Sequence, residues 1–238
     1  MNKIIVDIDN IQIKLCEKFK KSGWYDKMKG FILSSDFENI IKKLVEESNK
    51  GKKFTPILKY VFRAFEECKY SDLKVVFLSQ DVYPQIGVAD GIAFSSSLTN
   101  NETSSLKYIF NSIEEQYQLE NYERNPDLKR WANQGVLLIN CGMTCEINNV
   151  GSHIYLWKSF ISYLLDILNS YNTGLIFVFM GTEAQKYSEL INQKNNYVFN
   201  IDHPNKAYYT DKKRWNNKNI FKEIDKILLK NNNEKIIW

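Results

Sequence analysis

The chain has 238 residues, of which 44% are hydrophobic and 25% charged, and its formal net charge is +4 at pH 7. This length allows one sizeable core and requires no second one, so we expect a single domain over residues 1–238. No apolar run is long enough to cross a bilayer, and acidic residues near the start argue against a signal peptide. We therefore expect a cytoplasmic or nuclear protein that is not secreted and has no membrane partner.

The first part of the domain, residues 1–70, is predicted to be mostly helical. Apolar residues recur at helical spacing in FENIIKKLVEE (37–47) and in PILKYVFRAFEE (56–67). In the second segment Pro56 directly follows Thr55, an arrangement typical of a helix start. We expect these helices to form an outer layer of the fold.

Four short apolar runs follow: LKVVFL (73–78), GVLLIN (135–140), GLIFVFMG (174–181) and NYVFNI (196–201). A parallel strand that helices cover on both faces reads as a continuous apolar run. The helical segments expected around these runs are 104–117, 127–134, 154–168, 181–191 and 219–229. The pattern predicts an α/β fold of three layers, with a four-stranded parallel sheet flanked by helices.

Each apolar run ends close to a residue that can do polar chemistry. These residues are Asp81, Asn140, Thr182 and His203. Because ligands of such sheets bind outside the carboxyl ends of the strands, Asp81, Asn140 and His203 are candidate neighbours. The alternative is that each one caps a helix or forms a turn. A site with one carboxylate, one amide and one imidazole suits a reaction that breaks a bond through a charged, dissociative transition state. It suits acyl transfer less well.

Neither the cysteines nor the histidines have the spacing of a metal site. The cysteines are Cys16, Cys68, Cys141 and Cys145, and the histidines are His153 and His203. Three residues separate the one close cysteine pair, which argues against a zinc ribbon, a redox motif or an iron–sulfur cluster. We expect reduced thiols, no metal and no cofactor.

A basic segment, residues 205–219, follows His203. It interleaves cations with aromatic residues: Lys206, Lys212, Lys213, Arg214 and Lys218 with Tyr208, Tyr209 and Trp215. Cations of this kind bind phosphates, and the aromatic rings stack on bases or wedge between them. The alternative is a solvated loop that leads into the last helix. Gly181 and Thr182, at the start of another expected helix, form a candidate phosphate seat through free backbone N–H groups.

Collinear motifs from about residue 23 to residue 238 resemble the family-1 uracil-DNA glycosylases. LKVVFLSQDVYPQIGVADGIAFS is similar to the family's GQDPYH and GLAFS-like segments, and SSLKYIF to PSLKNIY. LKRWANQGVLLINCGMT resembles LxxWAxQGVLLLNxxLT, GSHIYLWKSF resembles NSHxxxGWExF, GTEAQK resembles GSxAQK, and DHPNKA stands where the family has HPSPLS. The resemblance implies the same four-stranded fold and a metal-independent hydrolase. Such an enzyme flips uracil out of DNA and breaks its N-glycosidic bond to start base-excision repair.

The resemblance also implies roles for residues at the matching positions. Asp81 would position the attacking water and stabilise an oxocarbenium-like sugar, and His203 would hydrogen-bond the uracil oxygen. Asn140 would read the polar edge of uracil and leave cytosine mismatched. The alternative for Asn140 is a turn cap.

Further roles concern the pocket walls and the DNA backbone. Phe94 would stack on the base, Tyr83 would occupy the space of a thymine methyl group, and Gln80 would line the pocket through its backbone. Ser105, Gly181 and Thr182 would hold flanking phosphates. The alternatives are core packing for the two aromatic residues and a position near a helix start for Ser105.

Two departures from the family pattern lie at the expected DNA surface. Pro84 replaces the histidine of GQDPYH, and Ala207 replaces a leucine that enters the gap left by the flipped base. The poxvirus branch also has proline at the first position and lacks the leucine. Tyr208 or Tyr209 is expected to replace the leucine, or the basic segment is expected to hold DNA. Thr182 keeps the hydroxyl of the family's serine, whereas Glu183 is unfavourable beside a phosphate unless it points away.

The sequence leaves an alternative function open: a non-catalytic DNA-binding protein or a replication-processivity partner on the same fold. The expected partners are uracil-containing DNA, single- or double-stranded, together with replication proteins or a protein inhibitor.

Overall fold

The computed structural model describes residues 4–210 and 214–238. The predicted phosphate contacts of Lys212 and Lys213 lie outside the described residues.

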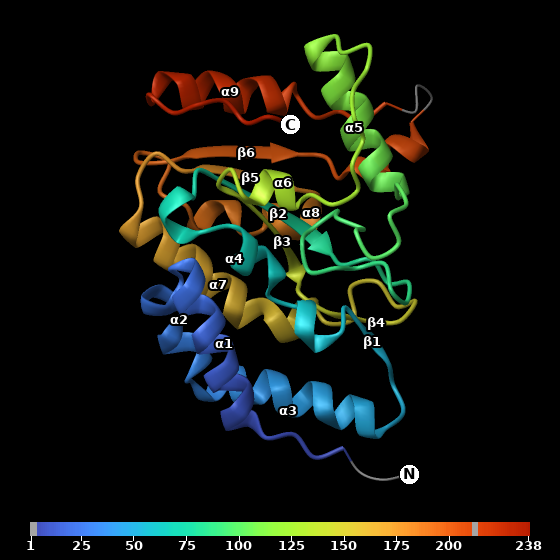
Figure 1. The fold of residues 1–238 in the computed structure, drawn as a ribbon, viewed down its shortest axis with the longest axis vertical. Helices are drawn as coiled ribbons and strands as arrows, with labels where there is room; N and C mark the ends of the chain where they lie inside the picture. The colour runs from blue at the N-terminus through green and yellow to red at the C-terminus, as the bar shows by residue number, and fades with distance from the viewer. Residues whose placement is uncertain (1–3, 211–213) are drawn as a thin grey trace.

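A four-stranded parallel sheet forms the centre of the fold (Figure 1). Its strands are β2 (Val75–Asp81), β3 (Val136–Gly142), β5 (Ile176–Met180) and β6 (Tyr197–Ile201), in the order β3-β2-β5-β6. The predicted sheet is confirmed. The strand β6 lies at an edge, and most of its side chains are partly exposed, so its apolar run does not reflect full burial.

Helices cover both faces of the sheet. Figure 1 shows α5 (Ser104–Tyr117) and α9 (Ile220–Lys230) on one side, where Phe77 of β2 contacts Trp238 and Trp238 contacts Phe221 of α9. On the other side lies α7 (Ile154–Tyr171), whose apolar face is buried as predicted. The helices α1 (Ile8–Ser22), α2 (Tyr25–Ile32) and α3 (Ser35–Asn49) pack beyond it, whereas α4 (Arg63–Glu67) packs directly against β3.

Short elements complete the structure. They are the antiparallel pair β1 (Phe54–Thr55) and β4 (Cys145–Glu146), the helices α6 (Lys129–Ala132) and α8 (Thr182–Gln185), and the 3-10 turns η1 (Leu58–Tyr60), η2 (Tyr70–Asp72), η3 (Ser188–Leu190) and η4 (Pro204–Tyr209). The helices expected at 127–134 and 181–191 are therefore shorter than predicted.

The helix expected to start at Pro56 does not form as one piece. Thr55 belongs to β1, and η1 and α4 follow separately. The backbone here packs against the loop at Gly91, where the Ala64 N–H donates to the Gly91 carbonyl at 3.3 Å. A Cβ on Gly91 would lie 1.7 Å from the Tyr60 carbonyl oxygen. This tertiary contact overrides the helical pattern of residues 56–67.

The described residues contain no helix long and apolar enough to cross a membrane. All four cysteines are free and buried, as expected for reduced thiols. Within residues 4–210 and 214–238, no group of three or more His, Cys, Asp or Glu could hold a metal ion.

Candidate active site

A cavity of about 340 Å³ opens at the carboxyl ends of β2 and β3. Parallel register brings Asp81 opposite Gly142 and Ser79 opposite Asn140. The cavity is lined by Asp81, Asn140 and His203, and also by Gln80, Tyr83, Phe94 and Ser105. The three residues predicted to be neighbours from the strand ends therefore share one cavity.

The Asp81 carboxylate is held by two backbone N–H groups. Val82 donates to Oδ1 at 3.1 Å, and Gly151 donates to Oδ2. Burial raises the pKa of Asp81 to about 7, while the hydrogen bonds from Gly151 and Val82 act in the opposite direction. Asp81 can therefore change its protonation state near neutral pH, which suits a group that accepts a proton during a reaction.

Gly142 and Gly151 are site residues that the sequence reasoning missed. Gly151 lies 70 residues from Asp81 in the chain, so no local pattern could reveal its hydrogen bond. A Cβ on Gly142 would lie 2.5 Å from Asp81 Oδ1. The glycine therefore leaves the space that the carboxylate occupies.

We expect Gly142→Ala to lower the catalytic rate by roughly 100-fold, because a shift of about 1 Å in a reacting group can have that effect. Single-turnover kinetics would measure the rate, and thermal unfolding would check the fold. Gly30→Ala in α2 is the matched control, since its Cβ would meet only the end of the Tyr163 side chain, at 2.8 Å. An unchanged rate in Gly142→Ala would contradict this role.

His203 is neutral and has a defined tautomer. It precedes η4, and its Nδ1 accepts a hydrogen bond from the Asn205 N–H at 3.2 Å. Burial lowers the pKa of His203 to about 4. Because Nδ1 is an acceptor in a neutral ring, the proton resides on Nε2, which is then a hydrogen-bond donor. Gly181 has φ 87°, and a Cβ there would lie 3.1 Å from His203 Cβ. The absence of a side chain at Gly181 therefore avoids a steric clash with His203.

Phe94 and Tyr83 form a fixed aromatic wall. The backbone of Phe94 has φ 66°, a strained value for a bulky residue. The Tyr83 hydroxyl donates to the Phe94 carbonyl at 3.0 Å and also contacts Thr103, the N-cap of α5. The Phe94 ring centroid lies 5.7 Å from that of His203. Strain of this kind, held in place by its surroundings, is typical of functional sites.

Asn140 is only 5% exposed, and its side chain hydrogen-bonds to none of the other described residues. The fully buried side-chain atoms without a partner in the described residues belong to Ser79, Trp131 and Asn196, so the Asn140 amide is accessible from the cavity. Because Asn140 lines the cavity, a ligand there can supply the missing donor and acceptor.

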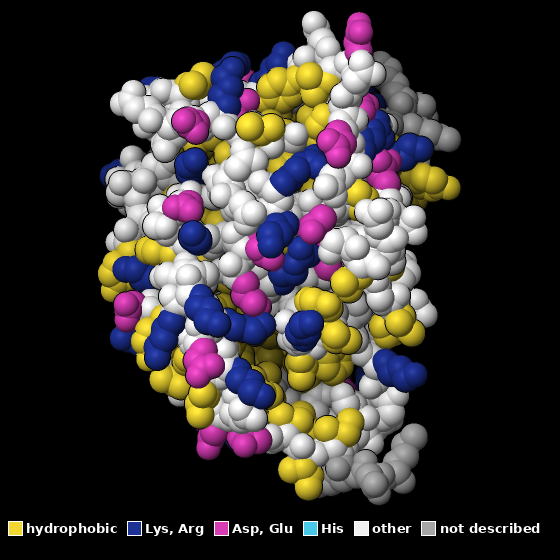
Figure 2. Space-filling model, in the orientation of Figure 1, with side chains coloured by type: hydrophobic (Ala, Val, Ile, Leu, Met, Phe, Trp, Pro, Cys, Tyr) yellow, Lys and Arg dark blue, Asp and Glu magenta, His cyan; other side chains and the backbone are white. Residues whose placement is uncertain are grey.

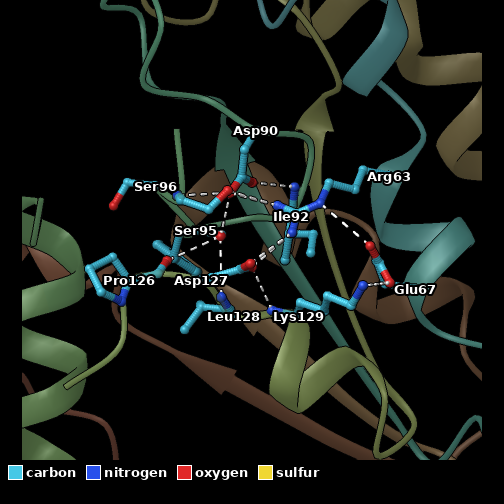
Figure 3. Close-up of polar contacts among 12 residues, drawn as sticks. Arg63, Glu67, Asp90, Ile92, Ser95, Ser96, Pro126, Asp127, Leu128 and Lys129 are labelled. Carbon is cyan, nitrogen blue, oxygen red and sulfur yellow. Dashed lines mark hydrogen bonds and ion pairs between the residues drawn. The ribbon is translucent and has the colours of Figure 1, made fainter. Parts of the chain in front are cut away.

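A partly buried ionic network holds the loop that carries the aromatic wall (Figure 3). Asp90, with no exposed surface, accepts hydrogen bonds from Ser95 and Ser97 and pairs with Arg63 at 2.7 Å. Arg63 also binds both carboxylate oxygens of Asp127, at 2.8 and 3.1 Å. The members of this network are distant in the chain, so no local sequence pattern indicated them. The network fixes the loop on both sides of Phe94.

Of the residues predicted to hold phosphates beside the flipped base, one lies at the cavity and two lie outside its lining. The Ser105 hydroxyl lines the cavity and donates to Asn205 Oδ1 at 2.6 Å. Gly181 and Thr182 are not part of the cavity lining. Glu183 pairs with Lys186 at 2.7 Å, which offsets the unfavourable charge expected there.

The described cations of the basic segment already have partners in the free protein. Lys206 pairs with Asp202 at 2.9 Å, and Arg214 pairs with Glu115. Lys218 donates to the Asn200 carbonyl at 2.9 Å. Lys206 lines the mouth of the cavity. Such exposed pairs are weak and can be exchanged for pairs with phosphates.

The aromatic residues of this segment divide into two kinds. Tyr208 and Tyr209 are 67% and 84% exposed, whereas Trp215 is 4% exposed and its Nε1 donates to the Asp202 carbonyl at 2.7 Å. Trp215 is thus a core residue, which corrects its assignment as a base-stacking residue. Ala207 is 1% exposed and packs inward, so its place among the DNA-binding residues needs the same correction.

Comparison with known proteins gives a consistent set of relatives. No family model matches the chain. The uracil-DNA glycosylase of Buchnera aphidicola subsp. Acyrthosiphon pisum (strain Tuc7) is 34% identical over 222 residues, 91% of this chain and 97% of the relative. That of Ureaplasma parvum serovar 3 is 37% identical over 187 residues, 75% of this chain and 84% of the relative. The crystal structure of mimivirus uracil-DNA glycosylase superposes with a TM-score of 0.84 at 25% identity, covering 98% of this chain and 89% of that one.

Proposed function

This chain belongs to the uracil-DNA glycosylase family, and from that premise we propose that its cavity binds a uracil base flipped out of DNA. The protein is a DNA glycosylase, a hydrolase that releases uracil from DNA to start base-excision repair. One observation carries the assignment of the site: Asp81, Asn140, His203 and Phe94 line the same cavity. A base inside an intact duplex could not reach it, so flipping is required.

The proposed chemistry begins with cleavage of the bond between the sugar and the base. The bonding electrons go to uracil, and the sugar becomes an oxocarbenium ion. The Asp81 carboxylate stabilises this cation and orients a water molecule towards it. When the water attacks the sugar carbon, its proton passes to Asp81, whose pKa of about 7 permits the transfer.

His203 stabilises the leaving base in this proposal. Negative charge grows on a uracil oxygen as the bond breaks, and the Nε2–H of the neutral imidazole donates to it. The Asn205 N–H on Nδ1 keeps the ring in this tautomer. A fixed neutral donor needs no reorganisation when the charge appears.

The base is recognised by its edge and its face. The Asn140 amide supplies one donor and one acceptor to the polar edge of uracil, and Phe94 stacks on its face. Tyr83 occupies the place of a thymine methyl group, and its hydrogen bond to the Phe94 carbonyl at 3.0 Å supports a rigid wall. Gln80 contributes backbone to the lining.

We further propose that Asn205 is a positioning residue, because it links α5 to the loop that carries His203. Replacing Asn205 by alanine removes the 2.6 Å hydrogen bond from Ser105. A hydrogen bond of this kind contributes about 1 kcal/mol, so we expect kcat to fall roughly fivefold. Ser105→Ala should have a similar effect on kcat, and the double variant should be no slower than the slower single variant. Additive losses at saturating DNA would contradict the link.

For DNA binding, the proposal retains Ser105, Gly181, Thr182, Lys206, Tyr208, Tyr209 and Arg214. Tyr209 lines the cavity mouth and is 84% exposed, which supports a role in filling the gap left by the flipped base. The finer assignment to family 1, with Pro84 and Ala207 as in the poxvirus branch, rests on the motifs alone. Binding of this chain to a protein inhibitor or to replication proteins stays a prediction.

Release of free uracil from a uracil-containing oligonucleotide in EDTA tests the function. A thymine-containing strand of the same sequence is the specificity control. We expect release from the uracil strand only, with single- and double-stranded forms compared side by side. Tight DNA binding without release would instead support the non-catalytic alternative.

A further inference from the structure

A second hollow lies away from the catalytic cavity, between α1, α3 and η1. Its volume is about 370 Å³, and its floor includes Phe37, Phe62 and Trp157. These aromatic side chains belong to the core, with exposed fractions of 0, 8 and 1%. Figure 2 shows apolar side chains in a depression over this region, with Lys or Arg side chains at its edges. The fold thus leaves part of its aromatic core accessible from one side.

The rim of this hollow is cationic. It is formed by Lys14, Lys18 and Lys59, and the lining contains no carboxylate among the described residues. Lys18 pairs with Glu66 at 2.6 Å. Lys14 and Lys59 form no salt bridge with another residue of the described part of the chain. An anionic group at the rim would therefore find free positive charge.

A larger apolar hollow, of about 1000 Å³, adjoins it at Ile57 and Leu58, and its lining residue Ala89 also lines the catalytic cavity. Ile57 lines the larger hollow and Leu58 the lysine-rimmed one, and these neighbours are 60% and 46% exposed. Lys52 and Lys53 line the larger hollow, whose described lining contains no carboxylate. Lys52 pairs with Glu146 at 3.0 Å, an exposed pair that a partner's carboxylate can replace. Across both hollows, apolar surface thus alternates with lysines.

We propose that this surface binds an acidic amphipathic segment of a partner protein. Its apolar side chains would enter the two hollows on either side of Ile57 and Leu58, and its carboxylates would meet the lysines on the rims. A helix with apolar residues at i, i+3, i+4 and i+7 presents such an apolar stripe between acidic faces. Single exposed apolar residues are common on protein surfaces, but two neighbouring apolar hollows of this size are typical of a binding surface.

The aromatic floor distinguishes this surface from a DNA-binding groove. A phosphate backbone would use the lysines but would leave the apolar hollows unfilled. An acidic amphipathic peptide uses both, which is why the observations favour it.

The test uses the full-length protein and a fluorescein-labelled peptide of about 12 residues, with leucine or tryptophan at the helical positions and glutamate elsewhere. We expect fluorescence anisotropy to show binding that is at least about tenfold tighter than that of the same peptide with lysine in place of glutamate. Leu58→Asp and Lys59→Glu should each weaken binding by about tenfold. Both residues lie at the surface, and all variants should release uracil at the native rate.

Matched controls separate this surface from general effects. Ile13→Asp alters an apolar residue of α1 that is 59% exposed and lies outside both hollow linings. Lys158→Glu reverses the charge of an exposed residue of α7 that lies outside both hollow linings. Both should bind the peptide within about twofold of the native chain. Absence of binding, equal affinity for the two peptides, or an unchanged affinity in Leu58→Asp would overturn the proposal. Displacement by single-stranded DNA with no sensitivity to Leu58 would assign the surface to DNA.

Discussion

Asp81→Asn is expected to lower the rate of uracil release by about 10²- to 10⁴-fold, the usual contribution of a positioned acid or base. Asparagine keeps the shape of the side chain and can still accept a hydrogen bond from Gly151 or Val82. It has no negative charge to stabilise the sugar cation and cannot take the proton of the attacking water. Single-turnover release from a uracil-containing oligonucleotide in EDTA would measure the loss.

The control for this variant is Asp26→Asn, which removes an exposed carboxylate whose one salt bridge within the described residues is with Lys29, at 3.0 Å. Its rate should equal that of the native chain. DNA binding by Asp81→Asn should persist, because the phosphate contacts are unchanged. A rate within tenfold of native would mean that another group performs the chemistry.

The same carboxylate determines the expected pH dependence. Burial raises the pKa of Asp81 to about 7, so the active carboxylate form increases as the pH rises through that value. The pKa of His203 is lowered to about 4, so its neutral form predominates over the same range. The rate should therefore rise with one ionisation near neutral pH and reach a plateau above it. The rise should be absent from the residual activity of Asp81→Asn.

His203→Ala is expected to have the second largest effect, a loss of about 10²- to 10³-fold in kcat, comparable to removing one oxyanion donor. The loss should appear in kcat more than in KM, because the donor matters most when charge develops on the base. Steady-state kinetics on the uracil oligonucleotide would separate the two parameters.

A glutamine variant provides the control for His203. His203→Gln retains an N–H donor on a flexible side chain and should recover part of the lost rate. The ionisation near pH 7 should remain in both variants, since it belongs to Asp81. Disappearance of that ionisation in His203→Ala would show that the imidazole, not the carboxylate, titrates during catalysis.

The sheet and much of the active site could be predicted from the sequence. Apolar runs indicated all four strands, and the strand ends indicated Asp81, Asn140 and His203 as neighbours. For β2, β3 and β5 this works because burial under helices leaves a continuous apolar run, and parallel strands bring their carboxyl ends to one edge. The edge strand β6 is apolar although most of its side chains are partly exposed. The motif resemblance then supplied the expected chemistry.

Other features depended on contacts between distant parts of the chain. Gly151 binds Asp81 across 70 residues, and Arg63 joins Asp127 across 64. Trp215 stands in a basic segment and resembles a stacking residue, yet its indole donates to the Asp202 carbonyl at 2.7 Å. The helical pattern after Pro56 was likewise overridden by the packing of that segment against Gly91.

The sequence by itself determined the strands, the longer helices and the edge of the sheet where the site lies, because the periodicity of buried residues is a local property. Only the tertiary structure decided the protonation states of Asp81 and His203, the strained backbone of Phe94, and the inward packing of Ala207 and Trp215. Burial and long-range hydrogen bonds control these features, and they exist only once distant segments pack together.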